Sequence, residues 1–336
     1  MLENTIHHAL ETLFHQPVFA YTYETNALQG GTVGQVDLVT GTANINGETK
    51  NFTLVYKYQK QWSRFKDPES WRREYDLYNS TFFSTMPSFQ VPICYYAEMN
   101  AEENAYCLWL QYVEGASGLQ LTVSMLTEAC YQLGQFQGHT VNQLESLKQT
   151  LQNVSDSSLM IQRYRFYRAL PAVYDFIRQE DCPIPSHLCA LLIEFDLHAD
   201  DIIEQIQQLP VTFNHRDFWN ANILATDDKI YVIDWDTSGF ANIGEDIASL
   251  IIDESHPSLI ATYYKQLIPA FYKGFYEQAP EKVITNPYIY EMILLQFGYR
   301  LIENYVDAET VQQKEDVIQA FEQLHEIRTQ QLLTYP

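Results

Sequence analysis

The segment 211–240 constrains this chain more than any other, because it places polar residues at fixed spacing around a short hairpin. It reads VTFNHRDFWNANILATDDKIYVIDWDTSGF. The runs NILA and IYVIDW predict two short strands joined across Asp227-Asp228. A hairpin of this kind would bring the polar loop before it close to the polar residues after it.

The spacing His215-x-Asp217-x4-Asn222 puts a carboxylate and an amide on one short loop. Phosphoryl transfer needs such a pair. The carboxylate must accept the proton of the acceptor hydroxyl, and the amide oxygen must hold magnesium against the phosphates. We therefore predict that Asp217 is the catalytic base and that Asn222 is a metal ligand.

Asp234 stands at the end of the second predicted strand, twelve residues after Asn222. Magnesium usually takes one or two protein carboxylates together with substrate phosphates, so Asp234 is the predicted principal metal ligand. A single aspartate in a loop is more often a cap or a turn residue. The prediction therefore depends on both motifs occurring together.

The first 114 residues predict a small lobe of strands and two helices. Asn46-Gly47 favours a hairpin turn, because both central positions of that turn require positive φ. Asp67-Pro68-Glu69 predicts a helix start, with a cap, a proline at the first helical position and an acid near the positive end. The expected order is a helix (1–16), three strands (18–58), a helix from residue 67, and two strands (91–99 and 105–113).

After residue 120 the apolar residues repeat at helical spacing, as in Leu126, Cys130 and Leu133. This pattern predicts a mostly helical second lobe, interrupted only by the hairpin segment. The boundary is expected near Gly115–Gly118, which divides the chain into lobes of residues 1–114 and 115–336. A length of 336 residues suits two such units.

Composition excludes several classes of protein. A formal net charge of −23 would repel nucleic acid and anionic membranes and would attract cationic substrates, although an acidic surface also simply aids solubility. The five cysteines form no CxxC pair, so reduced thiols are expected and a zinc site is not. The chain carries neither a signal-peptide pattern nor an apolar run of about 18 residues, so we expect a cytoplasmic protein without membrane contact.

HRDFWNANIL followed by YVIDWDTSGFANIGEDIASL resembles the aminoglycoside phosphotransferase and choline kinase family. The family's loop usually carries a small residue where Arg216 stands, so this loop is closer to that of protein kinases. The resemblance implies an α+β, bilobal, protein-kinase-like fold with an antiparallel sheet in the small N-terminal lobe. It also implies ATP (or GTP) as the phosphate donor and Mg2+ as the metal.

The resemblance assigns two further residues upstream. Lys57 ends the strand-like run LVYK and resembles the strand lysine that pairs with the nucleotide phosphates. Glu74 lies on the following helix and resembles the glutamate that orients this lysine. Taken alone, Lys57 would be an exposed strand lysine and Glu74 a solvated helix residue. The ordered set of motifs favours the functional interpretation.

Two more segments are assigned by the resemblance to the nucleotide. Gly31 and Thr32 lie in GGTVG, where the family has a phosphate-covering loop, although an ordinary hairpin turn explains these glycines equally well. Gln111 and Val113 lie in LWLQYVEG, which resembles the inter-lobe hinge that binds the adenine edge. That segment can also continue a sheet strand.

The resemblance gives other polar residues supporting or uncertain roles. His215 is expected to brace the catalytic loop, and Asp236 and Asp246 are expected to pair with donors or cap helices. Candidates for the acceptor pocket are two acids and three aromatic residues that could attract a cationic amine. They are Asp253, Glu254, Trp219, Tyr299 and Tyr305.

Three functions stay open from the sequence. The chain could phosphorylate a hydroxyl of an antibiotic, phosphorylate a small metabolic alcohol, or serve as a nucleotide-binding, coat or scaffold protein of kinase fold without turnover. The intact set of Lys57, Glu74, Asp217, Asn222 and Asp234 argues against the third, because a binding-only protein need not keep all five. The expected partner is a small hydroxyl acceptor, on a monomer or homodimer.

Overall fold

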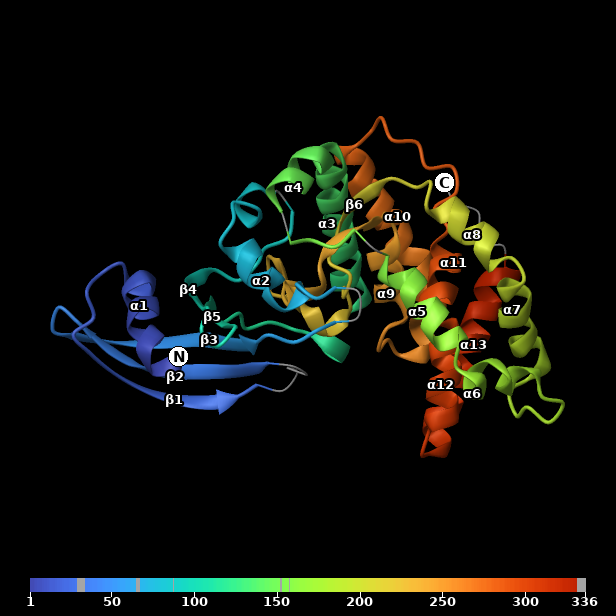
Figure 1. Cartoon of the computed structure of the whole chain (residues 1–336), viewed down its shortest axis with the longest axis horizontal. Coiled ribbons are helices and arrows are strands. Elements are labelled where there is room, and N and C mark those ends of the chain that lie inside the picture. Colours follow the sequence, from blue (N-terminus) through green and yellow to red (C-terminus); the bar gives the residue numbers. More distant parts are fainter. Residues whose placement is uncertain (29–33, 65–66, 87, 152, 157, 331–336) are drawn as a thin grey trace.

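A five-stranded antiparallel sheet lies at one end of the molecule and a helical part at the other (Figure 1). The computed structural model describes residues 1–28, 34–64, 67–86, 88–151, 153–156 and 158–330. The sheet order is β1-β2-β3-β5-β4, and every neighbouring pair is antiparallel. This arrangement confirms the predicted α+β class. The strands are β1 (Ala20–Ala27), β2 (Gln35–Ile45), β3 (Glu48–Lys60), β4 (Cys94–Asn100) and β5 (Ala105–Gln111).

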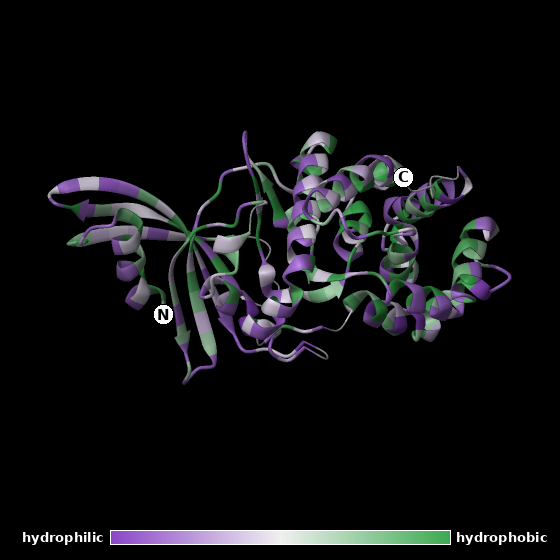
Figure 2. Cartoon of the chain, turned by 90° about the horizontal axis from the view of Figure 1, so that it is seen from above, coloured by the Kyte–Doolittle hydropathy of each residue, from purple (hydrophilic) through white to green (hydrophobic). Residues whose placement is uncertain are grey.

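Two helices cover opposite faces of this sheet, α1 (Leu2–Phe14) and α2 (Ser70–Tyr78). Successive side chains of a strand point to opposite faces. Trp109 of β5 therefore packs with the α1 cluster, whereas Tyr106 packs against Trp71 of α2. Figure 2 shows hydrophilic and hydrophobic bands alternating along these strands. The helix predicted over residues 1–16 is confirmed.

The β2–β3 hairpin turns at the predicted residues. Asn46 and Gly47 have φ of 50° and 87°, which is the pair of positive values that this turn requires. The start of α2 was predicted wrongly. The helix begins at Ser70, because the Asp67 carboxylate, expected to cap it, instead accepts two hydrogen bonds from buried Arg73 at 2.6 and 2.8 Å.

The second part of the chain is mostly helical, as predicted, and α3 and α10 cross closely at its centre. A Cβ on Gly134 of α3 would overlap the Phe271 carbonyl oxygen of α10, so only glycine permits this approach. None of the described helices combines the length and apolar character that crossing a membrane requires. The helices are α3 (Val123–Asn142), α4 (Leu144–Thr150), α5 (Leu159–Arg168), α6 (Pro171–Tyr174), α7 (Ser186–Asp196), α8 (Ala199–Ile206), α9 (Glu245–Ile252), α10 (Ile260–Gln278), α11 (Ile289–Ile293), α12 (Tyr299–Asp307) and α13 (Val311–Thr329).

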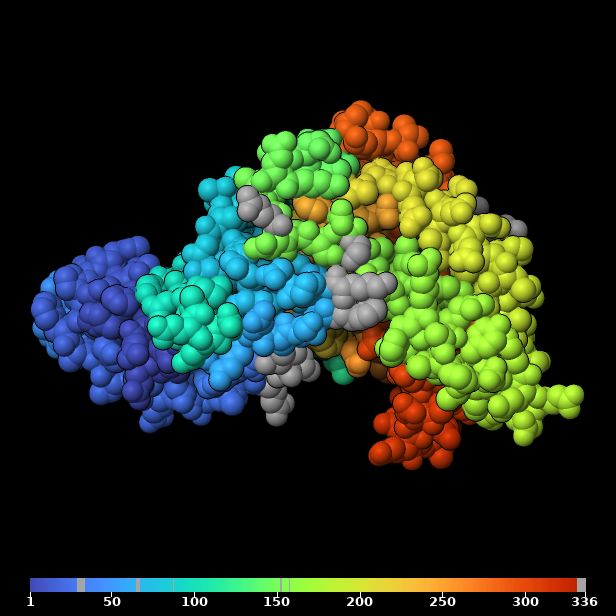
Figure 3. All heavy atoms as spheres, viewed as in Figure 1, coloured from blue at the N-terminus to red at the C-terminus, as the bar shows by residue number. Residues whose placement is uncertain are grey.

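The segment 77–89 connects the two parts of the molecule. Leu77, Phe82 and Phe89 belong to the core of the helical part, although they precede the last two strands of the sheet. In the space-filling view the light-blue segment that contains α2 lies between the dark-blue strands and the green helices (Figure 3). The lobe boundary between residues 114 and 115 therefore stays a prediction, because residues before it pack in the core of the helical part.

Two small sheets hold the polar loops of the helical part. The predicted hairpin forms from β7 (Ile223–Ala225) and β8 (Ile230–Val232). A second pair, β6 (Val211–Asn214) with β9 (Gly239–Asn242), was not predicted. β6 leads directly into His215, and β9 follows Asp234 closely, so the two sheets together fix both polar segments.

Candidate active site

Lys57 of β3 lies in the centre of an ion network that joins the sheet to the helical part. Its Nζ lies 2.5 Å from Glu74 Oε2 of α2 and 2.6 Å from Asp234 Oδ1. The Glu74 side chain is almost fully buried, whereas the Asp234 side chain is 40% exposed. The structure thus brings together three predicted site residues and leaves Asp234 open to solvent.

The electrostatics keep this network charged at Lys57 and Asp234. Burial disfavours the Lys57 ammonium, but Asp234 and Glu74 outweigh it and raise the pKa of Lys57 well above its ordinary value. Burial likewise disfavours the Asp234 carboxylate, but Lys57 outweighs it and lowers the pKa of Asp234. Burial raises the pKa of Glu74, against the opposing effect of Lys57. With two acidic partners, the Lys57 ammonium can exchange one of them for the phosphate of a ligand and still keep the other.

Asp234 adopts a backbone conformation that few residues other than glycine accept. Its φ and ψ are both 65°, in the left-handed region. The next residue, Trp235, is fully buried, and its indole N–H donates to the Val232 carbonyl at 3.1 Å. This anchor holds the turn after β8, so the carboxylate of Asp234 is aimed at Lys57. Strain of this kind gathers at functional sites.

The loop that begins at His215 is braced from below by a buried acid. The backbone N–H groups of His215 and Arg216 donate to the Asp246 carboxylate of α9 at 2.8 and 2.7 Å. The His215 ring lies 2.9 Å from the Ile233 carbonyl, and burial lowers the pKa of this histidine. His215 and Asp246 thus support the loop and its neighbouring strand, and burial raises the pKa of Asp246 to about 6.

Asp217 and Asn222 meet within this loop. The Asn222 Nδ2 donates to the Asp217 carbonyl at 2.9 Å and to Asp217 Oδ2 at 3.1 Å. The backbone N–H of Ile233 donates to the Asn222 carbonyl at 3.0 Å, which puts Asn222 next to the residue before Asp234. Burial and the Asp234 charge raise the pKa of Asp217, so its carboxylate accepts a proton more readily.

Asn222 and Asp234 fit a magnesium ion. Within the described residues both hydrogen bonds of the Asn222 side chain go through Nδ2, which leaves its oxygen for a cation. Only Oδ1 of Asp234 contacts Lys57. No group of three or more His, Cys, Asp or Glu in this part of the chain could hold a metal alone. Two ligands suffice when substrate phosphates supply the others, as magnesium prefers.

The segment after β5 links the sheet to the helical part. The Gln111 backbone N–H is already used, because it donates to the Ile93 carbonyl at 2.8 Å. Where the chain is described, the backbone of Tyr112 to Glu114, which includes Val113, makes no hydrogen bond, so it could face a base edge. A Cβ on Gly115 would lie 2.8 Å from the Ala225 carbonyl oxygen, which fixes where this link docks. Gly31 and Thr32 lie outside the described residues.

The sequence did not identify Arg73 as part of this site. Its buried guanidinium binds Asp67 and donates to the Asp236 carbonyl at 3.2 Å, so it ties α2 to the turn that follows Asp234. Arg64 approaches the same turn, with Nη2 3.5 Å from Asp236 Oδ2. Burial and the Asp234 charge raise the pKa of Asp236 to about 7. Neither arginine carried a sequence signal, because charge alone does not distinguish a buried arginine from a surface one.

The candidates for the acceptor pocket differ in their surroundings. Tyr299 and Tyr305 are buried and pack against other aromatic residues, so they belong to the core. Asp253 pairs with Arg300 at 3.1 Å. Glu254 has an exposed side chain, and its carbonyl accepts a hydrogen bond from Asn220 in the catalytic loop at 3.1 Å. Trp219 is half-buried in that loop.

Comparison with known proteins gives both a sequence match and structural neighbours. The profile of the phosphotransferase enzyme family matches residues 66–277. No curated protein matches the chain in a sequence search. A choline kinase from Cryptosporidium parvum Iowa II has a TM-score of 0.56 and 14% identity, covering 92% of this chain and 90% of that one.

Two further solved structures are similar over nearly their whole length. The microcompartment-associated aminopropanol kinase has a TM-score of 0.58 and 15% identity, covering 97% of this chain and 98% of that one. Amicoumacin kinase, solved in complex with AMP-PNP, Ca2+ and Ami, has a TM-score of 0.51 and 11% identity, covering 90% and 88%. At sequence identities this low, the similarity is evidence for the fold alone. The shared fold confirms the predicted bilobal kinase-like architecture.

The matched region includes α2 with Glu74, the loop from His215 to Asn222 and the turn at Asp234. It spans more than half of the chain and contains the polar network described above, apart from Lys57. The chain therefore belongs to the phosphotransferase enzyme family.

Proposed function

We propose that this chain is a magnesium-dependent kinase that transfers the γ-phosphate of ATP, or of GTP, to a hydroxyl of a small molecule. The observation that carries this proposal is the contact of Lys57 with both Glu74 and Asp234, across 177 residues in the case of Asp234. A largely buried lysine between two acids, one of them open to solvent, suits a triphosphate. The neighbouring carboxylate of Asp217 suits an acceptor hydroxyl.

Each residue has a role in this proposal. Lys57 pairs with the nucleotide phosphates and Glu74 holds it in position. Asn222 and Asp234 hold the magnesium ion, which supplies positive charge against the phosphate oxygens when bound. The Gln111 carbonyl and the backbone at Val113 bind the base edge. Gly31 and Thr32, which lie outside the described residues, are assigned to the phosphates by the sequence resemblance alone. The main contribution to the rate is positioning and electrostatic stabilisation.

The transfer step conserves atoms and charge. The acceptor hydroxyl oxygen forms a bond to the γ-phosphorus while the bond from that phosphorus to the bridging β–γ oxygen breaks. The electron pair of the broken bond leaves with ADP. The hydroxyl proton passes to the Asp217 carboxylate and from there to water. The raised pKa of Asp217 favours this acceptance of the proton.

Replacing Asp217 tests the proposal most directly. We expect Asp217→Ala to lower magnesium-dependent ATP consumption with a hydroxyl acceptor by at least about 100-fold, as for loss of a general base. Nucleotide affinity, measured by calorimetry with AMP-PNP, should stay unchanged. Asp227→Ala is the matched control, because this exposed aspartate lies on the hairpin turn. Near-wild-type turnover of Asp217→Ala would contradict the assignment.

The alternative is a kinase-fold protein that binds nucleotide without small-molecule turnover. Binding of AMP-PNP with no stimulation of ATP consumption by any member of a broad hydroxyl panel would favour it. If turnover occurs, a drug-resistance assay in cells that express the protein separates an antibiotic acceptor from a metabolic alcohol.

A further inference from the structure

Arg163 of α5 makes no ion pair within the part of the chain that the structure describes. Its side chain is half-buried, and its Nη1 lies 3.5 Å from the Gln296 Oε1, at the outer limit of a hydrogen bond. Among the described residues no carboxylate lies within ion-pair distance of its guanidinium. A neutral amide at this distance does not neutralise the charge, so a half-buried arginine is left without a counter-ion.

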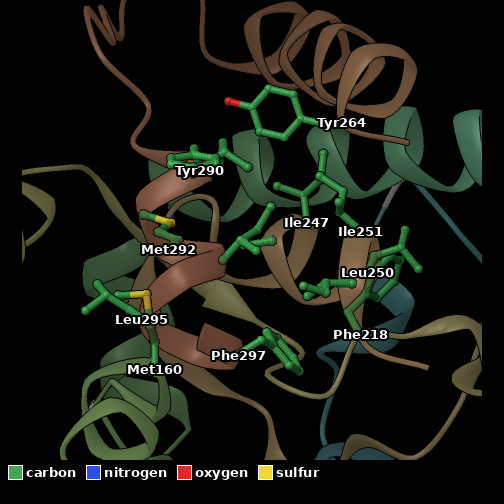
Figure 4. Packing of buried hydrophobic residues seen from close by; sticks show 14 of the residues in the cluster. Met160, Phe218, Ile247, Leu250, Ile251, Tyr264, Tyr290, Met292, Leu295 and Phe297 are labelled. Carbon is green, nitrogen blue, oxygen red and sulfur yellow. The ribbon is translucent and has the colours of Figure 1, made fainter. Parts of the chain in front are cut away.

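Rigid elements hold Arg163 in this position. Gln296 is buried, and its Nε2 donates to the Glu245 carbonyl at 3.0 Å. It lies in a π-helical turn (Leu294–Gly298), a rare geometry that is frequent at functional sites. In Figure 4, Met160 from the same helix as Arg163 lies beside Leu295 of this turn. Arg163 therefore lies beside a buried residue whose own position is fixed by a hydrogen bond.

The contacts of Gln296 bring Arg163 near the catalytic loop. Gln296 donates to the Glu245 carbonyl, and the carboxylate of the next residue, Asp246, accepts from the backbone of the catalytic loop. Burial and Asp234 raise the pKa of Asp217, and Arg163 acts in the opposite direction. Burial also raises the pKa of Asp253, and Arg300 and then Arg163 oppose it. Arg163 is therefore within electrostatic reach of both carboxylates, although it pairs with neither.

Asp253 is not the missing partner, because Arg300 already occupies it. Arg300 Nη1 lies 3.1 Å from Asp253 Oδ1, and its guanidinium lies 5.3 Å from the centre of the Phe297 ring. Figure 4 shows Phe297 near Leu250 of α9, in an apolar layer that also contains the catalytic-loop residue Phe218. Asp217 is needed for the acceptor hydroxyl. Within the described residues, Arg163 therefore has neither of these two acids as an ion-pair partner.

We infer that the acceptor is an alcohol that carries an anionic group, a carboxylate or a phosphate, which binds Arg163 while its hydroxyl meets Asp217. A partly buried charge without a partner is costly, and a bound anion would relieve this cost through charge-assisted hydrogen bonds. The inference rests on the proposed kinase function. It also reverses the expectation from the net charge of −23, because the local charge and not the total decides what enters the site.

A series of alcohols with the same three-carbon skeleton and different charge tests this inference. Glycerol is neutral, glycerate and glycerol 3-phosphate are anionic, and 3-amino-1,2-propanediol is cationic. Affinity is measured by calorimetry on the full chain saturated with Mg2+ and AMP-PNP, and turnover is measured with ATP. We expect the better anionic probe to bind about 10- to 100-fold more tightly than the neutral and cationic probes. A difference between glycerate and glycerol 3-phosphate identifies which anion is preferred.

Substitutions on α5 then assign the preference to one side chain. Arg163→Gln should abolish the preference for the anion, and Arg163→Lys should retain most of it. Arg165→Gln is the matched control, because Arg165 lies on the same helix and is exposed. The affinity for AMP-PNP should be unchanged in all three variants. A weaker AMP-PNP complex in Arg163→Gln would instead place Arg163 on the nucleotide and overturn the inference.

The remaining outcomes separate the two proposals. Equal binding of all four probes, no binding of either anion, or an anion preference that persists in Arg163→Gln each overturns the inference about the acceptor. If glycerol or the amine is then phosphorylated, the kinase function itself still stands. Failure of the wild-type chain to bind AMP-PNP with Mg2+ would instead contradict the kinase proposal.

Discussion

The two sides of the catalytic loop differ in how their charges are satisfied. On the side of the sheet, Lys57 contacts Glu74 and Asp234 within 2.6 Å, and one of these acids is almost fully buried. On the side of the helices, Arg163 has no ion-pair partner among the described residues, and Asp253 is paired only with Arg300. The charges on the first side are paired with one another, whereas the second side contains a charge without an ion-pair partner among the described residues.

This difference separates two requirements of a phosphate-transferring protein. The chemistry at the phosphates is the same for every acceptor, so its charges can be fixed in advance by the protein. Recognition of the acceptor instead depends on a polar group of the protein that pairs only with the bound ligand. Such a group discriminates strongly against ligands that cannot pair with it. Four substitutions test the comparison, from the largest expected effect to the smallest.

Lys57→Met should break the paired network of Lys57, Glu74 and Asp234 and have the largest effect. It removes the cation that pairs with the phosphates, so we expect kcat/KM for ATP to fall by about 100- to 1,000-fold. Steady-state kinetics and AMP-PNP binding measure this effect. Lys60→Met, at the exposed end of the same strand, is the control. A loss of less than about tenfold in a folded variant would show that Lys57 is not essential to the network.

Glu74→Gln should weaken the same network less. Lys57 keeps Asp234 as a partner, but the buried residue that orients it loses its charge. Residues that position a functional group typically contribute about 10- to 100-fold, and we expect kcat to fall by this factor. The free energy of unfolding is measured in parallel. Glu48→Gln, exposed at the start of β3, should leave both quantities unchanged, and an equal loss there would remove the argument for positioning.

Gly134→Ala tests the support of the helical side. The added methyl group would overlap the Phe271 carbonyl oxygen where α3 and α10 cross, and overpacking of this kind costs about 1–3 kcal/mol. Urea denaturation measures the free energy of unfolding. Glu128→Ala on the exposed face of α3 is the control. A variant as stable as the wild type would mean that the helices can separate without cost.

Asp196→Asn tests a fully paired charge cluster on the helical side. Asp196 accepts hydrogen bonds from Arg168 and Tyr164 at 2.5 and 2.6 Å. Burial disfavours its carboxylate, but these donors outweigh burial and lower the pKa of Asp196. Because Arg168 is partly exposed, we expect the variant to lose only about 1–2 kcal/mol at pH 7.

The pH dependence of that loss gives a second readout. A carboxyl whose pKa is lowered by folding stabilises the protein fully above its unfolded pKa of about 3.9, and the contribution is lost as the pH falls through the folded value. The difference between wild type and Asp196→Asn should therefore shrink in urea titrations below about pH 4. Asp181→Asn, an exposed control, should follow the wild type at every pH. A difference that grows in acid would contradict the lowered pKa.

Local signals in the sequence predicted much of the fold and most of the polar site. The apolar spacing predicted α1, Asn46-Gly47 predicted the turn between β2 and β3, and the strand pattern predicted the hairpin after Asn222. Each of these depends on residues that are close in sequence. The assignments of Lys57 and Glu74 came from the resemblance, and the structure brings both to Asp234.

Long-range contacts account for what the sequence did not predict. The strands β6 and β9 are short, and their pairing had no local signal. Asp67 was expected to cap α2, but its carboxylate instead binds the guanidinium of Arg73. Arg163 also carried no signal, since its meaning depends on the absence of a nearby acid in three dimensions. Such facts follow from packing and not from local spacing.

The contact between Lys57 and Asp234 also has a consequence for the order in which the chain is made. Translation adds roughly 5–20 residues per second, so 177 residues separate these two side chains by roughly 9–35 s at the ribosome. The other partner of Lys57, Glu74, follows only 17 positions after the lysine and is made early in this interval. Until Asp234 emerges, Lys57 therefore has only one of the two acid partners that it contacts in the complete structure.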